Sequence, residues 1–421
     1  MNESVRLGTA LLAVLGAEPR YRDPLHVGRP NVPSDLTRFH ERLEGILGKR
    51  WLTNDGSQVR EFEERISATL GVAHCVAMCN GTIALEIASR ALGFKGEVLA
   101  PAFTFVASVH ALSWQGIRPA FCDIDRQWHH LDASEIRARE CAETSGILGV
   151  HLWGRACNVE AIESEARRLG VPVLFDASHA FGCSFRGRMI GGFGSAETFS
   201  FHATKFINTF EGGAVTTNDG NLAERMRFMR NFGFSGEDCV SHVGTNGKMS
   251  EPSAAFGLSL LDELDRLVDW NRGNYQAYAA GLSEIPGIRL LVFDGLEKSN
   301  YQYVVVEVDE TEVGLSRDEI LAVLKAEGVL ARRYFYPGCH RMEPYVTEQP
   351  LLARQMPVTD FVAERVLVLP TGTAVTPDDA LSVCEVLKAA RGSAKEVRAA
   401  LAKESSSAPR FCEKSTSDCL N

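Results

Sequence analysis

The sequence predicts an α/β protein whose large domain is built on a mostly parallel mixed sheet and whose smaller C-terminal domain is α+β. From about residue 59 to 220, short apolar runs alternate with segments of helical spacing. This is the pattern of a parallel sheet covered by helices on both faces. After about residue 250 the pattern changes to one or two long helices, a strand and further helices.

The expected elements of the large domain follow one another closely. Residues 59–71 (VREFEERISATLG) and 81–93 (GTIALEIASRALG) have helical periodicity. The expected strands are short, apolar and bounded by turn residues: AHCVAMC (73–79), EVLAP (97–101), RPAFCDID (118–125), GILGVHLW (146–153), VPVLFDAS (171–178), ETFSFH (197–202) and GGAVTTNDG (212–220).

The C-terminal part begins with helical residues 250–282, followed by a strand at 300–310 and helices at 316–329 and 376–390. Residues 392–421 are Ser-rich and lack a sustained apolar face, so we expect a disordered tail. The predicted division is an N-terminal segment (1–30), a large domain (31–265), a small domain (266–391) and this tail (392–421).

Composition excludes several classes of protein. The net charge of -10 over 421 residues argues against nucleic-acid binding. The eleven cysteines are irregularly spaced and contain no C-x-x-C, so we expect no metal site, no disulfide framework and a cytoplasmic location. Residues 9–17 resemble a signal-peptide core but lack a positive flank, and no apolar run is long enough to span a membrane.

Lys205 is unusual because its segment, FSFHATKFINTFEGGAV (199–215), is rich in phenylalanine and small residues and is otherwise typical of a protein interior. An isolated buried ammonium is costly, whereas a lysine in an apolar pocket is a good Schiff-base nucleophile. The alternative is a lysine at a helix end that extends to solvent. The segment alone does not decide between them.

Asp176 ends an apolar strand, where α/β proteins place functional groups. A carboxylate there would keep a pyridinium nitrogen protonated, as a pyridoxal phosphate (PLP) enzyme requires. The alternative is that Asp176 caps the next helix. His179 lies three residues later. It either faces the same pocket or is a core histidine whose hydrogen bonds are made inside the protein.

Two further segments could contact the phosphate and the ring of a cofactor. Asn80, Gly81 and Thr82 lie between a strand and a helix, where free N–H groups suit a phosphate, although Asn-Gly-Thr is also a common turn and cap. Phe103 and Phe105 follow a strand and offer a ring to stack on a flat cofactor, unless both are core residues. A phosphate cradle, an aromatic ring, an acid and a buried lysine together indicate PLP.

The order of these segments and their residues resemble those of the DegT/StrS family of sugar aminotransferases, which have the PLP fold type I architecture. The resemblance covers about residues 25 to 390. The matching stretches are WLTNDGSQVREFE (51–63), NGTIAL (80–85), PAFTFVAS (101–108), GVHLWG (149–154), DASHAFG (176–182), SFHATK (200–205) with EGGA (211–214), RNFGF (230–234) and GTNGKMSEPSAAFGL (244–258).

The resemblance implies catalytic roles for three residues. Lys205 would bind PLP covalently and later move the proton between cofactor and substrate. Asp176 would pair with the pyridine nitrogen, and His179 matches a Gln or His position near the cofactor ring. Phe105, in preference to Phe103, would stack on that ring.

The resemblance also implies a phosphate site shared between subunits. Gly81, Thr82 and Ser200 would hold the cofactor phosphate. Asn246 would reach the phosphate of the neighbouring subunit, so the implied active unit is a homodimer. Ping-pong transfer from L-glutamate, releasing 2-oxoglutarate, would pass through pyridoxamine phosphate.

Features of the subgroup indicate the acceptor. Phe210 before the EGG, together with YFYPGCHRMEPY (334–345), resembles the branch that aminates C4 of nucleoside-diphosphate-4-keto-6-deoxyhexoses, most closely dTDP-4-keto-6-deoxyglucose, in antibiotic or glycan amino-sugar pathways. Substrate candidates are Tyr336, His340 and Arg341, unless they form an ordinary loop. Candidates for the glutamate carboxylate are Arg230 and Arg333.

Alternatives remain open at this level. A 3-keto-sugar or inosose aminotransferase would share every cofactor residue. Relatives with His in place of the lysine catalyse C3 deoxygenation, but here Lys205 is in register beside His202. A non-catalytic PLP-binding regulator would be expected to lose the lysine or the acid, and both are present.

Overall fold

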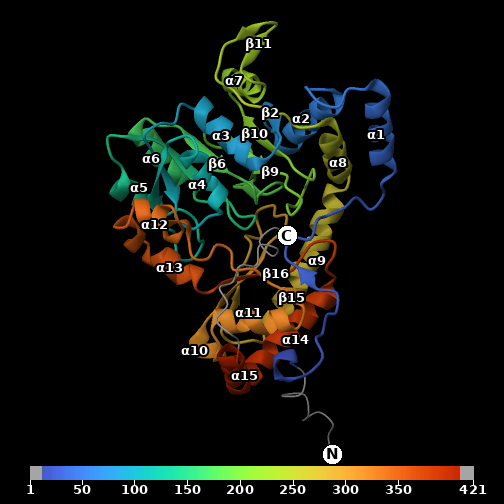
Figure 1. Cartoon of the computed structure of the whole chain (residues 1–421), viewed down its shortest axis with the longest axis vertical. Coiled ribbons are helices and arrows are strands. Elements are labelled where there is room, and N and C mark those ends of the chain that lie inside the picture. The colour runs from blue at the N-terminus through green and yellow to red at the C-terminus, as the bar shows by residue number, and fades with distance from the viewer. Residues whose placement is uncertain (1–11, 408–421) are drawn as a thin grey trace, which may run out of the picture.

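A seven-stranded mixed sheet forms the centre of the larger lobe in the computed structural model, which describes residues 12–407 (Figure 1). Its strand order is β2 (His74–Met78), β10 (Gly213–Thr217), β9 (Ala196–Ser200), β6 (Val173–Asp176), β5 (Thr144–Val150), β3 (Glu97–Pro101) and β4 (Arg118–Cys122). β10 runs antiparallel to the other six strands of this sheet. The predicted α/β class and mostly parallel sheet are confirmed.

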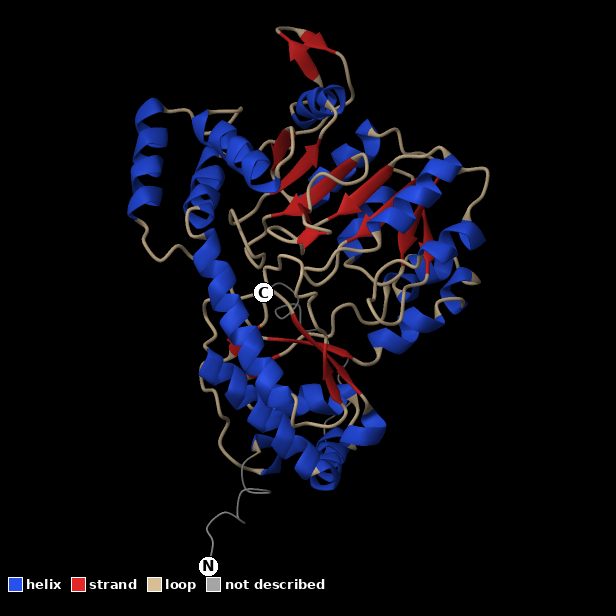
Figure 2. Cartoon of the chain, turned by 180° about the vertical axis from the view of Figure 1, so that it is seen from behind, coloured by secondary structure: helices blue, strands red, loops and turns tan. Residues whose placement is uncertain are grey.

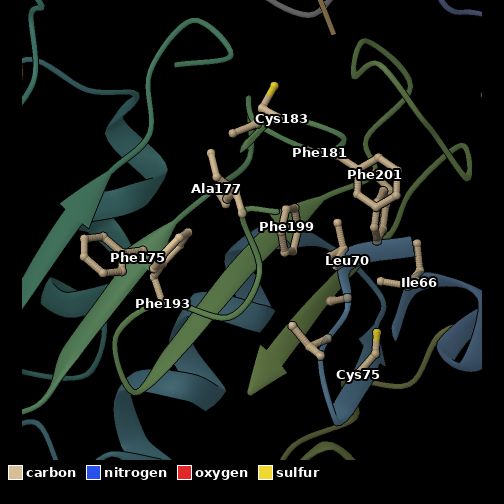
Figure 3. Close-up of a cluster of buried hydrophobic side chains, with 14 of the residues drawn as sticks. Ile66, Leu70, Cys75, Phe175, Ala177, Phe181, Cys183, Phe193, Phe199 and Phe201 are labelled. Carbon is tan, nitrogen blue, oxygen red and sulfur yellow. The ribbon is translucent and has the colours of Figure 1, made fainter. Parts of the chain in front are cut away.

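Helices cover both faces of this sheet because its strands alternate apolar side chains between two cores. In β2, for example, Cys75 and Ala77 join one buried cluster and Val76 and Met78 the other. One core, shown in part in Figure 3, packs against α2 (Ser57–Leu70), α5 (Ala133–Arg139), α6 (Val159–Leu169) and α8 (Glu251–Leu261). The opposite core packs against α3 (Gly81–Ala91), α4 (Val106–Ser113) and α7 (Gly220–Arg230).

The second lobe has a three-stranded antiparallel sheet and its own apolar core (Figure 2). The strands are β13 (Ile288–Leu290), β14 (Val304–Val308) and β16 (Val366–Leu369). The helices packed on this sheet are α9 (Leu264–Leu282), α11 (Arg317–Ala326) and α14 (Pro377–Gly392). The structure thus has the expected α+β pattern after residue 250, and the precise domain boundaries stay predictions.

Shorter elements connect and flank the two lobes. They are η2 (Ala13–Leu15), β1 (Leu25–His26), α1 (Thr37–Lys49), β7 (Ser184–Phe185), β8 (Arg188–Met189), β11 (Phe234–Gly236), β12 (Cys239–Val240), α10 (Glu310–Val313), β15 (Val329–Leu330), η3 (Cys339–Arg341), α12 (Tyr345–Glu348), η4 (Leu352–Arg354) and α13 (Pro357–Ala363). The β11–β12 hairpin projects from the top of the larger lobe (Figure 1).

The N-terminal segment joins the two lobes. Strand β1 pairs in parallel with β15, and the buried carboxylate of Glu327 accepts the backbone N–H groups of Ala13 (2.6 Å) and Arg20 (3.0 Å). Further along, the Asn31 side chain donates to the Phe206 carbonyl, next to Lys205, and accepts from Thr373. This segment therefore ties the smaller lobe to the lysine loop.

The expectation of a disordered tail from residue 392 is wrong for its first part, which is the helix α15 (Ala394–Ser407). Val397 is fully buried in the core of the smaller lobe, and Arg398 pairs with Glu310 and Glu319. A few contacts on one side of the helix are sufficient here, although no long apolar face marks them in the sequence. Residues 408–421 lie outside the described part of the chain.

Candidate active site

The segments that carry Gly81, Asp176 and Lys205 meet at one edge of the large sheet because of the register of its strands. Gly213, at the start of β10, pairs with Ser200 at the end of β9 and with Met78 at the end of β2. Asp176 ends β6 and pairs with Thr198 of β9. The turn after β2, the lysine loop after β9 and the end of β6 therefore lie together, at the strand ends where α/β folds build their sites.

Glycines allow the turn after β2 to approach the lysine loop closely. A Cβ on Gly81 would lie 2.9 Å from the Cβ of Ser200, and one on Gly213 would lie 2.5 Å from the carbonyl of Asn80. The Asn80 side chain caps α3 by accepting the N–H of Ile83 (2.8 Å). The first N–H groups of α3, at Gly81 and Thr82, therefore begin a helix beside the Ser200 hydroxyl, an arrangement that suits an anion.

Asp176 is buried, and its carboxylate is held by three hydrogen bonds. Oδ2 accepts the hydroxyl of Ser108 (2.8 Å), and Oδ1 accepts both the hydroxyl (2.6 Å) and the backbone N–H (3.0 Å) of Ser178. The Ser108 hydroxyl is in turn 3.0 Å from that of Thr104. These contacts fix the orientation of the carboxylate at the strand end.

Lys205 is partly buried in a small pocket that it shares with His179, Ser200 and Tyr303. Burial lowers the pKa of its amine to about 8, although the nearby charge of Asp176 acts in the opposite direction. A much larger fraction of this lysine than of an exposed one is therefore neutral near neutral pH, as a nucleophilic amine must be.

His179 forms one wall of the same pocket. Its ring lies 4.1 Å from that of Tyr303, and its Nδ1 accepts the backbone N–H of Trp153 (3.4 Å). Burial, and secondly the charge of Lys205, holds the pKa of His179 well below its usual value. The ring is therefore neutral, and the bond to Nδ1 leaves its proton on Nε2.

The two phenylalanines of PAFTFVAS have different environments. Phe103 is fully buried and packs against Trp153, His129 and Phe335. Phe105 precedes α4 and is 52% exposed, with its ring 6.1 Å from that of Phe335. Of the pair, only Phe105 has a ring face free for a ligand.

The substrate candidates near residue 340 are not gathered with Lys205. His340 is 1% exposed and its Nε2 lies 2.9 Å from Asp360, which also pairs with Arg341 (2.5 Å). Tyr336 lies between the guanidinium groups of Arg317 (5.0 Å) and Arg333 (4.8 Å). Among residues 12–407, the member of this loop that reaches His179 and Phe105 is Phe335, 6.0 and 6.1 Å away.

Two other candidates have settings of their own. Arg230 is buried and already paired with Glu63 (2.6 Å) and Asp55 (2.8 Å), so it has no free edge for a substrate carboxylate. Asn246 is exposed on the loop before α8, in a backbone bridge with Asn231. Its predicted role toward a partner subunit stays a prediction.

Sequence reasoning missed Tyr303, Phe335, Ser108 and Ser178. The two serines lie inside quoted segments, and a hydroxyl two residues after a strand-end aspartate is a signal for such a hydrogen bond. Tyr303 and Phe335 come from distant parts of the chain and have no local signal. Within residues 12–407, no group of acidic, Cys and His side chains is arranged to hold a metal ion, and no helix is long and apolar enough to cross a membrane.

Comparison with known proteins gives a consistent result over most of the chain. Residues 33–388 match the model of the DegT/DnrJ/EryC1/StrS aminotransferase family. A dTDP-4-amino-4,6-dideoxy-D-glucose transaminase of Shigella dysenteriae is 36% identical over 359 residues, covering 84% of this chain and 96% of the relative. A GDP-perosamine synthase of Caulobacter vibrioides is 33% identical, covering 82% and 96%.

Among solved structures, the chain is similar to DesI, crystallised in the presence of its TDP-sugar product. The identity is 46% and the TM-score 0.88, with 92% of this chain and 98% of DesI covered. The similarity extends over both lobes, so it includes the strand edge that carries Lys205 and Asp176.

Proposed function

Because the chain belongs to the DegT/DnrJ/EryC1/StrS aminotransferase family, we propose that it transfers the amino group of L-glutamate to C4 of dTDP-4-keto-6-deoxyglucose. The product is a 4-amino-4,6-dideoxy sugar nucleotide. The observation that carries this choice is the similarity to DesI and to the Shigella transaminase over more than four-fifths of the chain.

The enzymes of this family depend on PLP, and the site fits that cofactor. Gly81, Thr82 and Ser200 would hold the phosphate, because the start of α3 directs free N–H groups beside the Ser200 hydroxyl. Phe105 and His179 would flank the ring. When bound, PLP supplies the electron sink that stabilises a carbanion at the substrate carbon.

The chain's own groups would perform the proton transfers. The Asp176 carboxylate, oriented by Ser108 and Ser178, would hold a proton on the pyridine nitrogen. The amine of Lys205, neutral in an appreciable fraction because burial lowers its pKa, would attach the cofactor. Once released, it would take a proton from the donor carbon and return one to the acceptor carbon. We propose that Asn246 completes the phosphate site of a second copy in a homodimer.

A half-reaction tests the proposal directly. The PLP-loaded enzyme is treated with L-glutamate, the donor is removed, and dTDP-4-keto-6-deoxyglucose is added while the cofactor absorbance is followed. Return of the starting spectrum, with NMR showing an amino group at C4, supports the proposal. If glutamate converts the enzyme but this sugar does not restore the spectrum, the assigned acceptor is wrong.

A panel of acceptors addresses the remaining choices. The GDP-linked 4-keto sugar matters because GDP-perosamine synthases are also relatives. A 3-keto sugar nucleotide and an inosose represent the alternatives that share the cofactor residues. We expect the dTDP-linked 4-keto sugar to have the highest kcat/KM of the panel.

A further inference from the structure

A second cavity lies apart from the Lys205 pocket, between the loops that follow β4 and β5 and the loop that precedes β14. Its volume is about 560 Å³, within the range of roughly 300–1,000 Å³ that small-molecule sites occupy. It shares no lining residue with the Lys205 pocket. The proposed transamination therefore does not account for it.

Arg155 lines this cavity and is only 9% exposed. Its guanidinium donates to two backbone carbonyls, those of Trp128 (3.0 Å) and Val292 (3.4 Å), and its Nε has no partner. No carboxylate of residues 12–407 forms an ion pair with it. Burial lowers the pKa of Arg155 to about 10, which leaves the group charged at neutral pH.

The other buried arginines of the described chain show how unusual this is. Arg230 lies 2.6 Å from Glu63, and Arg317 lies 2.7 Å from Asp318. Glu307, whose charge acts on Arg155, is already bonded to His129, Arg126 and Arg289. A buried charge without a counter-ion is costly, so a bound anion would stabilise Arg155.

The walls of the cavity indicate what the anion is attached to. The ring of Trp128 lies 5.3 Å below the Arg155 guanidinium, and the half-buried rings of Phe185 and Phe293 also line the space. His130 is buried there with an unpartnered Nε2. Aromatic walls with a few polar groups suit a flat ligand with one charged end.

The remaining charged groups of the lining do not neutralise Arg155. The carboxylates of Asp125, Asp132 and Asp294 accept backbone N–H groups of their own turns. The carboxylate of Glu297 accepts the backbone N–H groups of Arg186 and Gly187, between β7 and β8. Of the other two cations, Arg186 pairs with Glu160 and Lys298 is exposed at the rim. Arg155 is thus the buried, uncompensated charge of the cavity.

We propose that this cavity is a binding site for a small organic anion, a phosphate or carboxylate attached to a flat apolar ring. The anionic group contacts the Arg155 guanidinium, which can donate from Nε and an Nη in the paired geometry that phosphates and carboxylates accept. The ring of the ligand lies among Trp128, Phe185 and Phe293.

The test is calorimetric titration of the PLP-loaded enzyme with phenyl phosphate, in a buffer free of phosphate. Loading with PLP keeps the cofactor's phosphate site filled. We expect saturable binding with a Kd of about 1 mM or tighter. Arg155→Leu should weaken it at least about tenfold, as the loss of a charge-assisted hydrogen bond does. Arg155→Lys keeps the positive charge but loses the paired N–H donors of the guanidinium, so it should bind with intermediate affinity.

Matched controls separate this site from general charge effects. Lys388→Gln removes one positive charge from the exposed face of α14 and should bind phenyl phosphate as the wild type does. Retained PLP absorbance shows that each variant is folded. Binding that is equal in wild type and Arg155→Leu, or absent from the wild type, overturns the proposal. If inorganic phosphate binds as tightly as phenyl phosphate, and this binding also depends on Arg155, the proposal that the ligand carries an apolar ring is overturned.

Discussion

Two clusters of buried ionisable groups in this molecule differ in whether their charges are neutralised. In β14, the carboxylate of Glu307 lies within 3.1 Å of the guanidinium groups of Arg126 and Arg289 and of the Nε2 of His129. Although burial raises its pKa, bonds to His129 and Arg289 bring it down to about 2. At Lys205 no ion pair forms among the described residues, and burial lowers the pKa to about 8.

The difference separates structural from chemical roles. A carboxylate paired with arginine side chains, such as Glu307, is stable and unreactive, because its charge is neutralised. An amine left without a counter-ion destabilises the fold but has the neutral form that a nucleophile needs. We therefore expect substitutions at Lys205 and Asp176 to affect turnover, and substitutions at Glu307 to affect stability.

Lys205→Ala should have the largest effect. It removes both the covalent attachment and the base, so turnover of a 4-keto sugar should fall by at least about 10³-fold. Noncovalent PLP binding should persist through the phosphate cradle. Measurement of kcat alongside PLP content by absorbance checks both statements. Full activity in this variant would contradict the assigned role.

Asp176→Asn should reduce kcat by about 10²-fold or more, because a neutral amide cannot stabilise a protonated pyridine nitrogen. The amide keeps the shape of the carboxylate, so folding should change little. Ser178→Ala, which removes one of the hydroxyls that orient Asp176, is the matched control and should lose much less. Steady-state kinetics of the two variants at equal PLP loading provides the comparison.

Glu307→Gln should leave turnover per PLP-loaded protomer near wild type but lower the free energy of unfolding by about 3 kcal/mol, since it removes a buried charge that accepts hydrogen bonds from Arg126, Arg289 and His129. The control is Glu284→Gln, which breaks an exposed pair with Lys388 and should lower the free energy of unfolding much less, because exposed ion pairs contribute little. Denaturant unfolding measures both. Equal losses would contradict the structural role of the Glu307 cluster.

The pH dependence of unfolding sharpens the same test. The carboxyl of Glu307 has a pKa of about 2 in the fold against 4.5 unfolded. Its stabilisation is therefore complete above about pH 4.5 and is lost as the pH falls toward 2. In Glu307→Gln this part of the acid sensitivity should be missing.

Much of this arrangement could be predicted from local sequence. Short apolar runs bounded by turn residues predict the strands. Asp176 ends β6, Gly81 lies three residues after β2 and Lys205 lies five residues after β9, at strand ends that the sheet brings together. The family resemblance supplied the roles that we expect for them. Phe105 could be preferred over Phe103, and the structure shows that Phe103 is core.

What could not be predicted depends on long-range contacts. His340 and Arg341 are polar residues in a suggestive loop, but Asp360, some twenty residues later, binds both. Tyr303 and Phe335 reach His179 only because the smaller lobe packs over the strand ends. Helix α15 is held by the buried Val397, by Ala394 and Leu401 packed on the same core, and by ion pairs with distant acids, which no local pattern reveals.

The smallest expected effect is the pH profile of PLP capture by the apo-enzyme. Burial sets the pKa of Lys205 at about 8 against 10.5 for an exposed lysine, so the rate should rise about tenfold per pH unit up to pH 8 and level off above it. The unfolded lysine keeps its proton to higher pH, so the stability of the apo-enzyme should also rise between pH 8 and 10.5. Stopped-flow absorbance gives the rates. A rate that climbs steadily to pH 10.5 would mean that the amine is solvated, and the contrast with Glu307 would then rest on pairing alone.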